Sequence, residues 1–221
     1  MAGEFLISED RLIKLRATRS GRTSYAGYNY QCGYAVSRLA SMVTAKPLFG
    51  VTDYPRLLRY DWAEDLDELL DDGSVCFTQC KRVGDIGQPA QLADVLLGFA
   101  PKWLWTPEND RNHVRFRLVS CDPRFRNRSN HEDVRADVLG QFKKLLQIDL
   151  SPNSDRSLWQ ADAIAVGVEP LFEALWSKLS FPYVESASVA DDLAGPILAS
   201  EAAARDLLLR VGLATASNQK A

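Results

Sequence analysis

The chain has 221 residues, of which 46% are hydrophobic, and a formal net charge of −3. A chain of this size can bury a hydrophobic core and fits one domain, or one domain with a helical appendage. The acidic net charge is not typical of a nucleic-acid-binding protein, and without a run of about 18 apolar residues no membrane span is expected.

Hydrophobic periodicity predicts the first elements of the fold. A short strand or helix is expected around residues 5–15, and a polar break follows at residues 18–24. Apolar residues at helical spacing then predict a helix over residues 28–43. Gln31 lies in the first turn of this helix, at one edge of the apolar stripe, where its amide needs a polar partner inside the fold. A hydrogen bond to a backbone group is the simplest such partner.

The next segment is predicted to form strands joined by a tight turn. Residues 56–62 and 65–70 are strand candidates, or one long bent strand. The Asp-Asp-Gly-Ser sequence at residues 71–74 is a strong hairpin signal, and residues 75–81 form the following strand. Alternation along that strand places Gln79 and Lys81 on the same face as Val75 and Phe77, with Cys76, Thr78 and Cys80 on the other face.

The length of the hairpin loop decides which acid faces Gln79 and Lys81. A two-residue turn pairs Glu64 with Lys81. A three-residue loop that ends in a left-handed Gly73 pairs Asp65 with Gln79 instead. We favour the three-residue loop, because it places the Asp65 carboxylate on the face that carries Gln79 and Lys81.

The second half of the chain is predicted to be mainly helical. Pro89 suits the first turn of a helix that runs to about residue 100, and Trp103 and Trp105 follow as packing residues. Residues 113–121 alternate and predict a half-buried strand. Apolar stripes then predict three helices, at residues 134–146, from residue 170 to residue 179, and after residue 200. We therefore predict a core of residues 1–130 and a helical extension of residues 131–221 packed on it, with further domains possible in a longer native protein.

The N-terminal segment and the cysteines indicate a reducing compartment. The first ten residues contain acids and no apolar signal-peptide core, so a cytoplasmic location is expected. The four cysteines (Cys32, Cys76, Cys80 and Cys121) include no C-x-x-C pair. Free thiols are favoured over a zinc site, because no second ligand pair accompanies Cys76 and Cys80.

The acids before the hairpin and the Gln-x-Lys sequence after it suit a divalent metal ion and a phosphate. A carboxylate, with a second acid and a backbone carbonyl, can hold Mg²⁺ through hard oxygen ligands. Such an ion polarises a phosphate and lowers the pKa of an attacking water. A lysine stabilises the charge on the phosphate as a point cation. These residues therefore predict a metal-dependent nuclease.

The predicted α-β-β-β-α-β order, with an acid before a hairpin and a lysine after it, resembles the PD-(D/E)xK nuclease superfamily. Three segments narrow the resemblance: Gly-Tyr-Asn-Tyr-Gln at 27–31, Glu-Asp-Leu-Asp at 64–67 and Phe-Thr-Gln-Cys-Lys at 77–81. They look like the Q-x-K endonuclease effector domains of bacterial CBASS and related antiphage defence proteins, in which glutamine replaces an acid of the motif. The resemblance implies an α/β restriction-endonuclease-like core, a mixed sheet flanked by helices, followed by C-terminal helices.

The resemblance also implies roles for individual residues. Asp65 corresponds to the metal-binding aspartate, Gln79 replaces the second acid, and Lys81 is the catalytic lysine. Gln31 is implied to reach the site from the first helix. Mg²⁺ is the implied cofactor, with Mn²⁺ as an alternative, and Asp67 is a further candidate ligand beside Asp65 and Gln79.

The acid run leaves the identity of the main ligand open, because Glu64 or Asp67 could replace Asp65. The family implies cleavage of double-stranded DNA in bacterial antiviral defence, with activation by oligomerisation. This chain is too short for the sensor domain that members usually carry, so a homo-oligomer or a regulatory sensor domain or subunit is the expected partner. Candidate contacts to the DNA backbone are the basic residues Arg16, Arg19, Arg22, Arg82, Arg115 and Arg117.

Two other function classes compete with the nuclease. The acidic charge and the C-terminal helices suit a catalytically inactive, nuclease-like interaction module within a defence or restriction complex. A thiol- or histidine-based hydrolase is disfavoured, because neither His113 nor His131 lies beside a convincing nucleophile motif.

Overall fold

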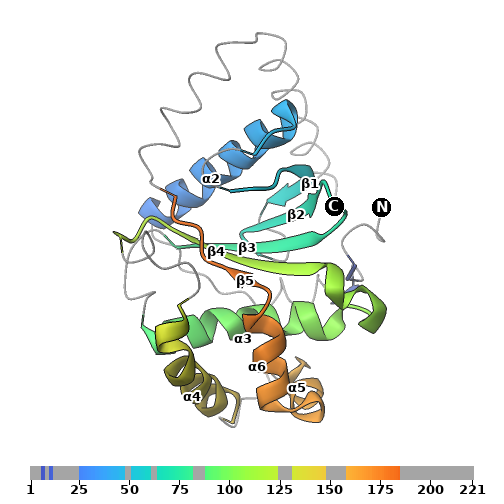
Figure 1. The fold of residues 1–221 in the computed structure, drawn as a ribbon, viewed down its shortest axis with the longest axis vertical. Coiled ribbons are helices and arrows are strands. Elements are labelled where there is room, and N and C mark those ends of the chain that lie inside the picture. Colours follow the sequence, from blue (N-terminus) through green and yellow to red (C-terminus); the bar gives the residue numbers. More distant parts are fainter. Residues whose placement is uncertain are drawn as a thin grey trace.

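The computed structural model describes residues 6–7, 10–11, 25–47, 51–60, 64–81, 88–123, 131–147 and 158–184. In this part of the chain, one sheet of five strands lies between helices (Figure 1). The strands are adjacent in chain order: β1 (Pro55–Tyr60), β2 (Leu66–Leu70), β3 (Val75–Lys81), β4 (Val114–Ser120) and β5 (Leu179–Ser180). Strands β1 to β3 are antiparallel, whereas β4 is parallel to β3 and β5 is parallel to β4.

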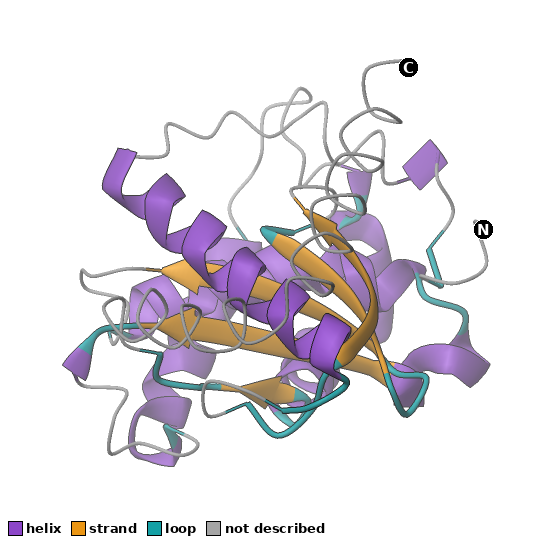
Figure 2. Ribbon diagram, turned by 90° about the horizontal axis from the view of Figure 1, so that it is seen from above, coloured by secondary structure: helices purple, strands orange, loops and turns teal. Residues whose placement is uncertain are grey.

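Helices cover both faces of this sheet. Helix α2 (Tyr25–Thr44) crosses one face, as the view in Figure 2 shows. The other face carries α3 (Pro89–Trp105), α4 (Arg135–Leu146), α5 (Gln160–Val166) and α6 (Val168–Trp176) (Figure 1). Two short 3₁₀ segments, Glu108–His113 and Glu132–Val134, precede β4 and α4. The expected mixed sheet flanked by helices is confirmed. None of the described helices combines the length and the apolar character that crossing a membrane requires.

The hairpin between β2 and β3 has the three-residue loop that the sequence favours. The Leu70 N–H donates to the Ser74 carbonyl at 2.8 Å, and the Gly73 N–H donates back to the Leu70 carbonyl at 3.1 Å. Gly73 has a φ of +84°, in the left-handed region that glycine adopts at little cost. Leu66 consequently lies opposite Thr78, so the same register continued by one residue sets Asp65 opposite Gln79.

The sheet separates two hydrophobic clusters. Between the sheet and α3, the Phe99 and Phe116 rings stack with centroids 4.7 Å apart, and Phe77 belongs to the same cluster. Under α2, the second cluster contains Tyr34 and Cys80 together with Tyr30, Leu66 and Val119. Successive residues of β3 therefore point to opposite clusters, which puts Gln79 on the α3 side and Cys80 on the α2 side.

Several elements differ from their predictions, among them helix α5, which was not predicted at all. Helix α3 continues through Pro101 to Trp105, five residues past the predicted end. Pro101 removes one backbone hydrogen bond of the helix but does not end it. Strand β4 is buried on both sides from Phe116 to Ser120 rather than half-buried, because it is central and parallel and has helices on each face; Arg115, near its start, is exposed. The two-residue strand β5 has too short an apolar pattern to be predicted.

The described part of the predicted extension packs on the core. Residues of α4, α5 and α6 contribute to the same hydrophobic cluster as α3, and the segment after α6 supplies β5. The helix predicted after residue 200, and most of the segment predicted around residues 5–15, lie outside the described residues.

Candidate active site

Three of the four acids that precede and enter β2 are buried in ion pairs. Glu64 is 1% exposed and pairs with Lys102 of α3. Asp67 is fully buried, and its Oδ2 lies 3.2 Å from Arg59 Nη2. Glu68 is also fully buried and pairs with two arginines. These contacts give Glu64, Asp67 and Glu68 structural roles.

Asp65, the fourth acid, is half-buried and binds a backbone amide. Its Oδ2 accepts a hydrogen bond from the Cys80 N–H at 2.7 Å. In a continued antiparallel ladder that N–H would face the Glu64 carbonyl, because the bonded pairs of this hairpin recur at every second residue from Leu70 and Ser74. The Asp65 carboxylate therefore takes the place of the Glu64 carbonyl as acceptor at the end of the β2–β3 ladder, where the two strands separate.

Gln79 and Lys81 lie at the same end of the sheet. Gln79 is half-buried and Lys81 is exposed, one position before and one after Cys80. Alternation puts both side chains on the α3 side of β3. On the other edge of β3, Lys81 pairs with Ser120 of β4. The structure thus brings Asp65, Gln79 and Lys81 to one end of the β2–β3 pair, as their proposed roles require.

Gln31 occupies a different position relative to the sheet. It is half-buried on α2, the helix that covers the Cys80 side rather than the Gln79 side. Its neighbour Tyr30 donates a hydrogen bond from its hydroxyl to the Val184 carbonyl at 2.9 Å, which anchors the start of α2 beyond the end of β4. Gln31 therefore shares the Lys81 end of the sheet but approaches it from the opposite face. Its role in the site remains a prediction.

Asp67 is a weaker candidate for a metal ligand than Asp65. Its Oδ1 accepts the Glu64 N–H at 3.0 Å, while its Oδ2 faces Arg59. Both oxygens of this buried carboxylate consequently have protein partners. The choice between Glu64, Asp65 and Asp67 that the sequence leaves open therefore favours Asp65, which alone of the three is not buried.

The predicted DNA contact at Arg117 does not fit the structure. Its guanidinium is buried, with Nη1 at 2.6 Å from Glu68 Oε2 and Nη2 at 2.7 Å from Asp53 Oδ2. Arg115 is exposed and pairs with Asp72 at the hairpin loop. It lies beside Cys76, about 17 Å along β3 from Lys81, too far to share a phosphate with that lysine. The candidates Arg16, Arg19, Arg22 and Arg82 lie outside the described residues.

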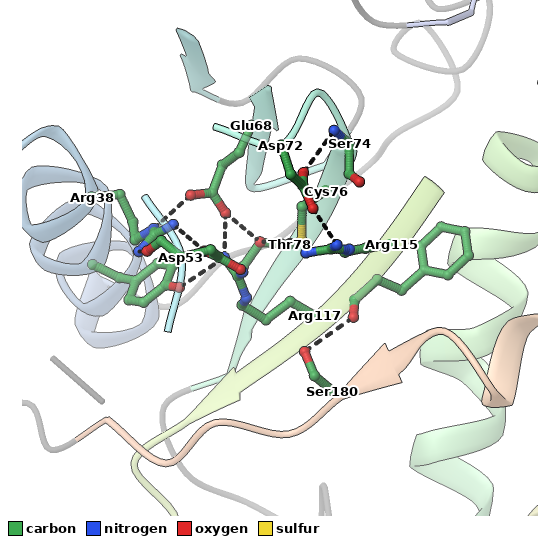
Figure 3. Close-up of polar contacts among 12 residues, drawn as sticks. Arg38, Asp53, Glu68, Asp72, Ser74, Cys76, Thr78, Arg115, Arg117 and Ser180 are labelled. Atoms are coloured by element: carbon green, nitrogen blue, oxygen red, sulfur yellow. Dashed lines mark hydrogen bonds and ion pairs between the residues drawn. The ribbon is translucent and has the colours of Figure 1, made fainter. Parts of the chain in front are cut away.

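A buried polar network, which the sequence analysis missed, joins α2 to the sheet. Figure 3 shows its members converging from α2, the segment before β1, β2, β3 and β4: Arg38, Asp53, Glu68, Thr78 and Arg117. Arg38 Nε lies 2.5 Å from Glu68 Oε1, and its Nη2 lies 2.7 Å from Asp53 Oδ1. The Thr78 hydroxyl donates to Glu68 Oε2 at 3.0 Å.

The network keeps both arginines charged despite their burial. Burial by itself lowers the pKa of Arg38, but the adjacent Glu68 carboxylate more than compensates and the pKa is raised. Burial also lowers the pKa of Arg117, and neighbouring anionic groups, Glu68 and Asp53 among them, raise it well above its ordinary value. Burial raises the pKa of the Tyr34 hydroxyl, which lies in the same region. These residues stabilise the fold beside the candidate site.

The thiols near the site are poor nucleophiles. All four cysteines are free. Burial, and then the nearby Asp65 carboxylate, raise the pKa of Cys80 well above its ordinary value. Burial likewise raises the pKa of Cys76 to about 11. Since the thiolate is the reactive form, neither residue suits a cysteine nucleophile.

The donors at the end of β2 and β3 fit a Mg²⁺ ion that keeps some of its water. Among the residues that the structure describes, no three His, Cys, Asp or Glu side chains form a group that could hold a metal ion. Mg²⁺ is commonly bound by one or two carboxylates together with waters and substrate phosphates, so a complete protein cage is not required. Asp65 offers a carboxylate and Gln79 an amide oxygen from adjacent strands. Both are hard oxygen donors of the kind that this ion prefers.

The function of this site has to be inferred from the residues of this chain. Comparisons with protein-family models, with curated proteins and with solved structures found no match for the chain.

Proposed function

We propose that the protein is a metal-dependent endonuclease that hydrolyses phosphodiester bonds of double-stranded DNA. The observation that carries the proposal is the contact of Asp65 with the Cys80 amide, in a register that sets Asp65 opposite Gln79. An acid, an amide and a lysine are thereby gathered on adjacent strands. The order of helices and strands supports a restriction-endonuclease-like core, with a bacterial antiphage effector of the Q-x-K type as the specific assignment.

Each residue of the proposed site has a chemical role. The Asp65 carboxylate, oriented by the Cys80 N–H, and the Gln79 amide oxygen would hold Mg²⁺ or Mn²⁺. When bound, this ion supplies Lewis-acid activation of the phosphate and of a water. The Lys81 ammonium is exposed and can stabilise the negative charge that develops on the phosphate. Because Gln79 is neutral, the site repels a phosphate less than a pair of carboxylates does.

The partners follow from this assignment. Double-stranded DNA is the proposed substrate. A homo-oligomer, or a separate sensor domain or subunit, is proposed to control cleavage, so the protein should be assayed both alone and in its assembled form. The proposed setting is the bacterial cytoplasm.

Plasmid cleavage tests the proposal. The wild-type protein should degrade plasmid DNA with Mg²⁺ or Mn²⁺ and not with EDTA. Lys81→Ala should lose cleavage while its circular dichroism spectrum stays that of the wild type. Lys144→Ala removes another exposed lysine, on α4, and should retain wild-type cleavage. Full activity of Lys81→Ala would show that the site is assigned wrongly.

The second candidate function is a catalytically inactive, nuclease-like interaction module. Exposed apolar side chains favour it, since Leu158 is 45% exposed and Ile164 on α5 is 63% exposed. Apolar side chains mark a protein interface where they belong to a contiguous exposed patch. This alternative predicts no metal-dependent cleavage by the wild-type protein under any assembly condition.

A further inference from the structure

Lys102 is buried inside the protein beside the candidate site. Its side chain is 3% exposed, and its Nζ donates to Glu64 Oε1 and, at 2.6 Å, to the Gly98 carbonyl. Glu64 is 1% exposed. A lysine is almost never buried so completely unless it is paired, because its charge loses hydration. The pair therefore fixes the residue that precedes Asp65 to helix α3.

Glu64 and Asp67, which lie on either side of Asp65 in the sequence, are both held by hydrogen bonds and ion pairs. The Glu64 N–H donates to Asp67 Oδ1 at 3.0 Å, and Asp67 in turn pairs with Arg59 of β1. Asp65 lies between these two buried acids and is itself half-buried. Its own carboxylate accepts a hydrogen bond from the Cys80 N–H at the point where β2 and β3 separate.

We propose that Lys102 is a positioning residue, which holds Glu64 against α3 so that the Asp65 carboxylate stays at the end of the β2–β3 ladder in the orientation that binds a divalent cation. That Asp65 binds a divalent cation is part of the proposed function, on which this inference rests. Lys102 does not contact the phosphate or the ion in this scheme, because its Nζ is buried and committed to Glu64 and Gly98. It acts through the backbone of residues 64 and 65.

The sign of a mutational effect separates positioning from a direct electrostatic influence. If the charge of Lys102 acted directly on the cation, it would repel it, and removal of that charge would strengthen binding. If Lys102 positions Asp65, its removal lets the Asp65 carboxylate move and binding weakens. Removing an outer residue that orients a ligand typically weakens metal binding by about 10- to 100-fold.

Binding of Mn²⁺ to the full chain, followed by electron paramagnetic resonance, measures this effect. Asp65→Asn should lose binding. Lys102→Met and Glu64→Gln should each weaken Mn²⁺ binding by about tenfold or more. Arg38→Met is the matched control, because it breaks a buried ion pair on the opposite face of the sheet and should leave the affinity unchanged. Wild-type or tighter binding by Lys102→Met would overturn the inference.

Hydrogen exchange of the Cys80 amide tests the positioning without metal. In Lys102→Met the Cys80 N–H should exchange faster relative to the Phe77 N–H of the same strand, which corrects for a loss of global stability. The Arg38→Met control should leave this ratio unchanged. If the wild type binds no Mn²⁺, the metal site of the proposed function fails, whereas an unchanged exchange ratio in Lys102→Met refutes the positioning role itself. Glu64→Gln, which keeps a side-chain oxygen, replaces Lys102→Met in the same measurement if that variant does not fold.

Discussion

The Oδ2 atom of Asp65 lies 2.7 Å from the amide nitrogen of Cys80 and accepts its hydrogen bond. Two substitutions separate this structural contact from the proposed chemistry. Asp65→Asn keeps an oxygen acceptor and removes the charge, so stability should stay close to that of the wild type while cleavage is lost. Asp65→Ala also leaves the amide without its acceptor and should lower the free energy of unfolding by about 1–3 kcal/mol.

Urea unfolding and plasmid cleavage, measured on the same preparations, check both expectations. Cleavage by Asp65→Asn at the wild-type rate would remove Asp65 from the proposed site. Equal unfolding free energies for Asp65→Ala and Asp65→Asn would show that the Cys80 contact contributes nothing to stability.

Glu68 should be among the most sensitive positions of the fold. Glu68→Ala leaves the buried guanidinium groups of Arg38 and Arg117 without their shared carboxylate. Breaking a buried pair from one side costs about 3–5 kcal/mol, because an uncompensated charge stays buried. Unfolding by guanidinium chloride should show this loss of unfolding free energy. The control Glu173→Ala breaks an exposed pair with Arg135 and should cost about 0–1 kcal/mol. Similar losses in the two variants would contradict the structural role of the network.

Gly73 and Gly140 provide a matched test of backbone conformation. A Cβ at either position meets no atom within 4 Å, so packing does not distinguish them. Gly73 has a φ of +84°, and Gly73→Ala should destabilise the protein by about 1–2 kcal/mol through strain alone. Gly140 lies within α4, where Gly140→Ala should stabilise it by about 0.5–1 kcal/mol. The melting temperature should therefore fall in Gly73→Ala and rise in Gly140→Ala. A shift of the same sign in both variants would contradict the left-handed conformation of Gly73.

Local patterns predicted much of the fold. Alternation and the Asp-Asp-Gly turn predicted β2 and β3 and favoured the observed register, but the choice between a two- and a three-residue loop, which determines which residues pair, came from the structure. Helices α2, α3, α4 and α6 followed from apolar spacing. The pairing of β4 with β5 could not be predicted, because it depends on contacts between residues such as Phe116 and Leu179 that are far apart in the chain.

The polar interior was predicted less well, for a physical reason. Whether a charged side chain is exposed or buried depends on partners from distant elements, as Arg117 with Asp53 and Lys102 with Glu64 illustrate. Charge and spacing alone predict a solvated face for such residues. Among the acids of residues 64–68, the structure shows buried ion pairs for Glu64, Asp67 and Glu68, and it shows a half-buried Asp65 whose carboxylate accepts the Cys80 N–H.

Cys76 should make stability fall in alkaline solution. Burial raises its pKa to about 11, from an ordinary value of 9.0. The thiol of the unfolded chain ionises first, so this contribution is fully present below about pH 9 and is lost as the pH rises towards 11. Over that interval the loss is about 2–3 kcal/mol. Cys76→Ala removes the titration, and its free energy of unfolding should fall less steeply between pH 8 and pH 10.5, as urea denaturation at each of several pH values (roughly half-unit steps) can show. An identical slope in both proteins would contradict the burial of this thiol.

Gln79 should determine how strongly the site depends on its metal. Gln79→Glu places a second carboxylate opposite Asp65, and two like charges at that distance repel in the metal-free protein. The melting temperature should fall without metal and rise more on addition of Mn²⁺ than in the wild type, because the ion neutralises both charges. Gln91→Glu adds the same charge at an exposed position of α3 and should show no added Mn²⁺ effect. Gln79→Ala, which removes the oxygen donor, should bind Mn²⁺ more weakly than the wild type. If Mn²⁺ shifts the melting temperatures of wild type and Gln79→Glu equally, Gln79 is not part of the cation site, and the ligand set has to be sought elsewhere on the Asp65 side of the sheet.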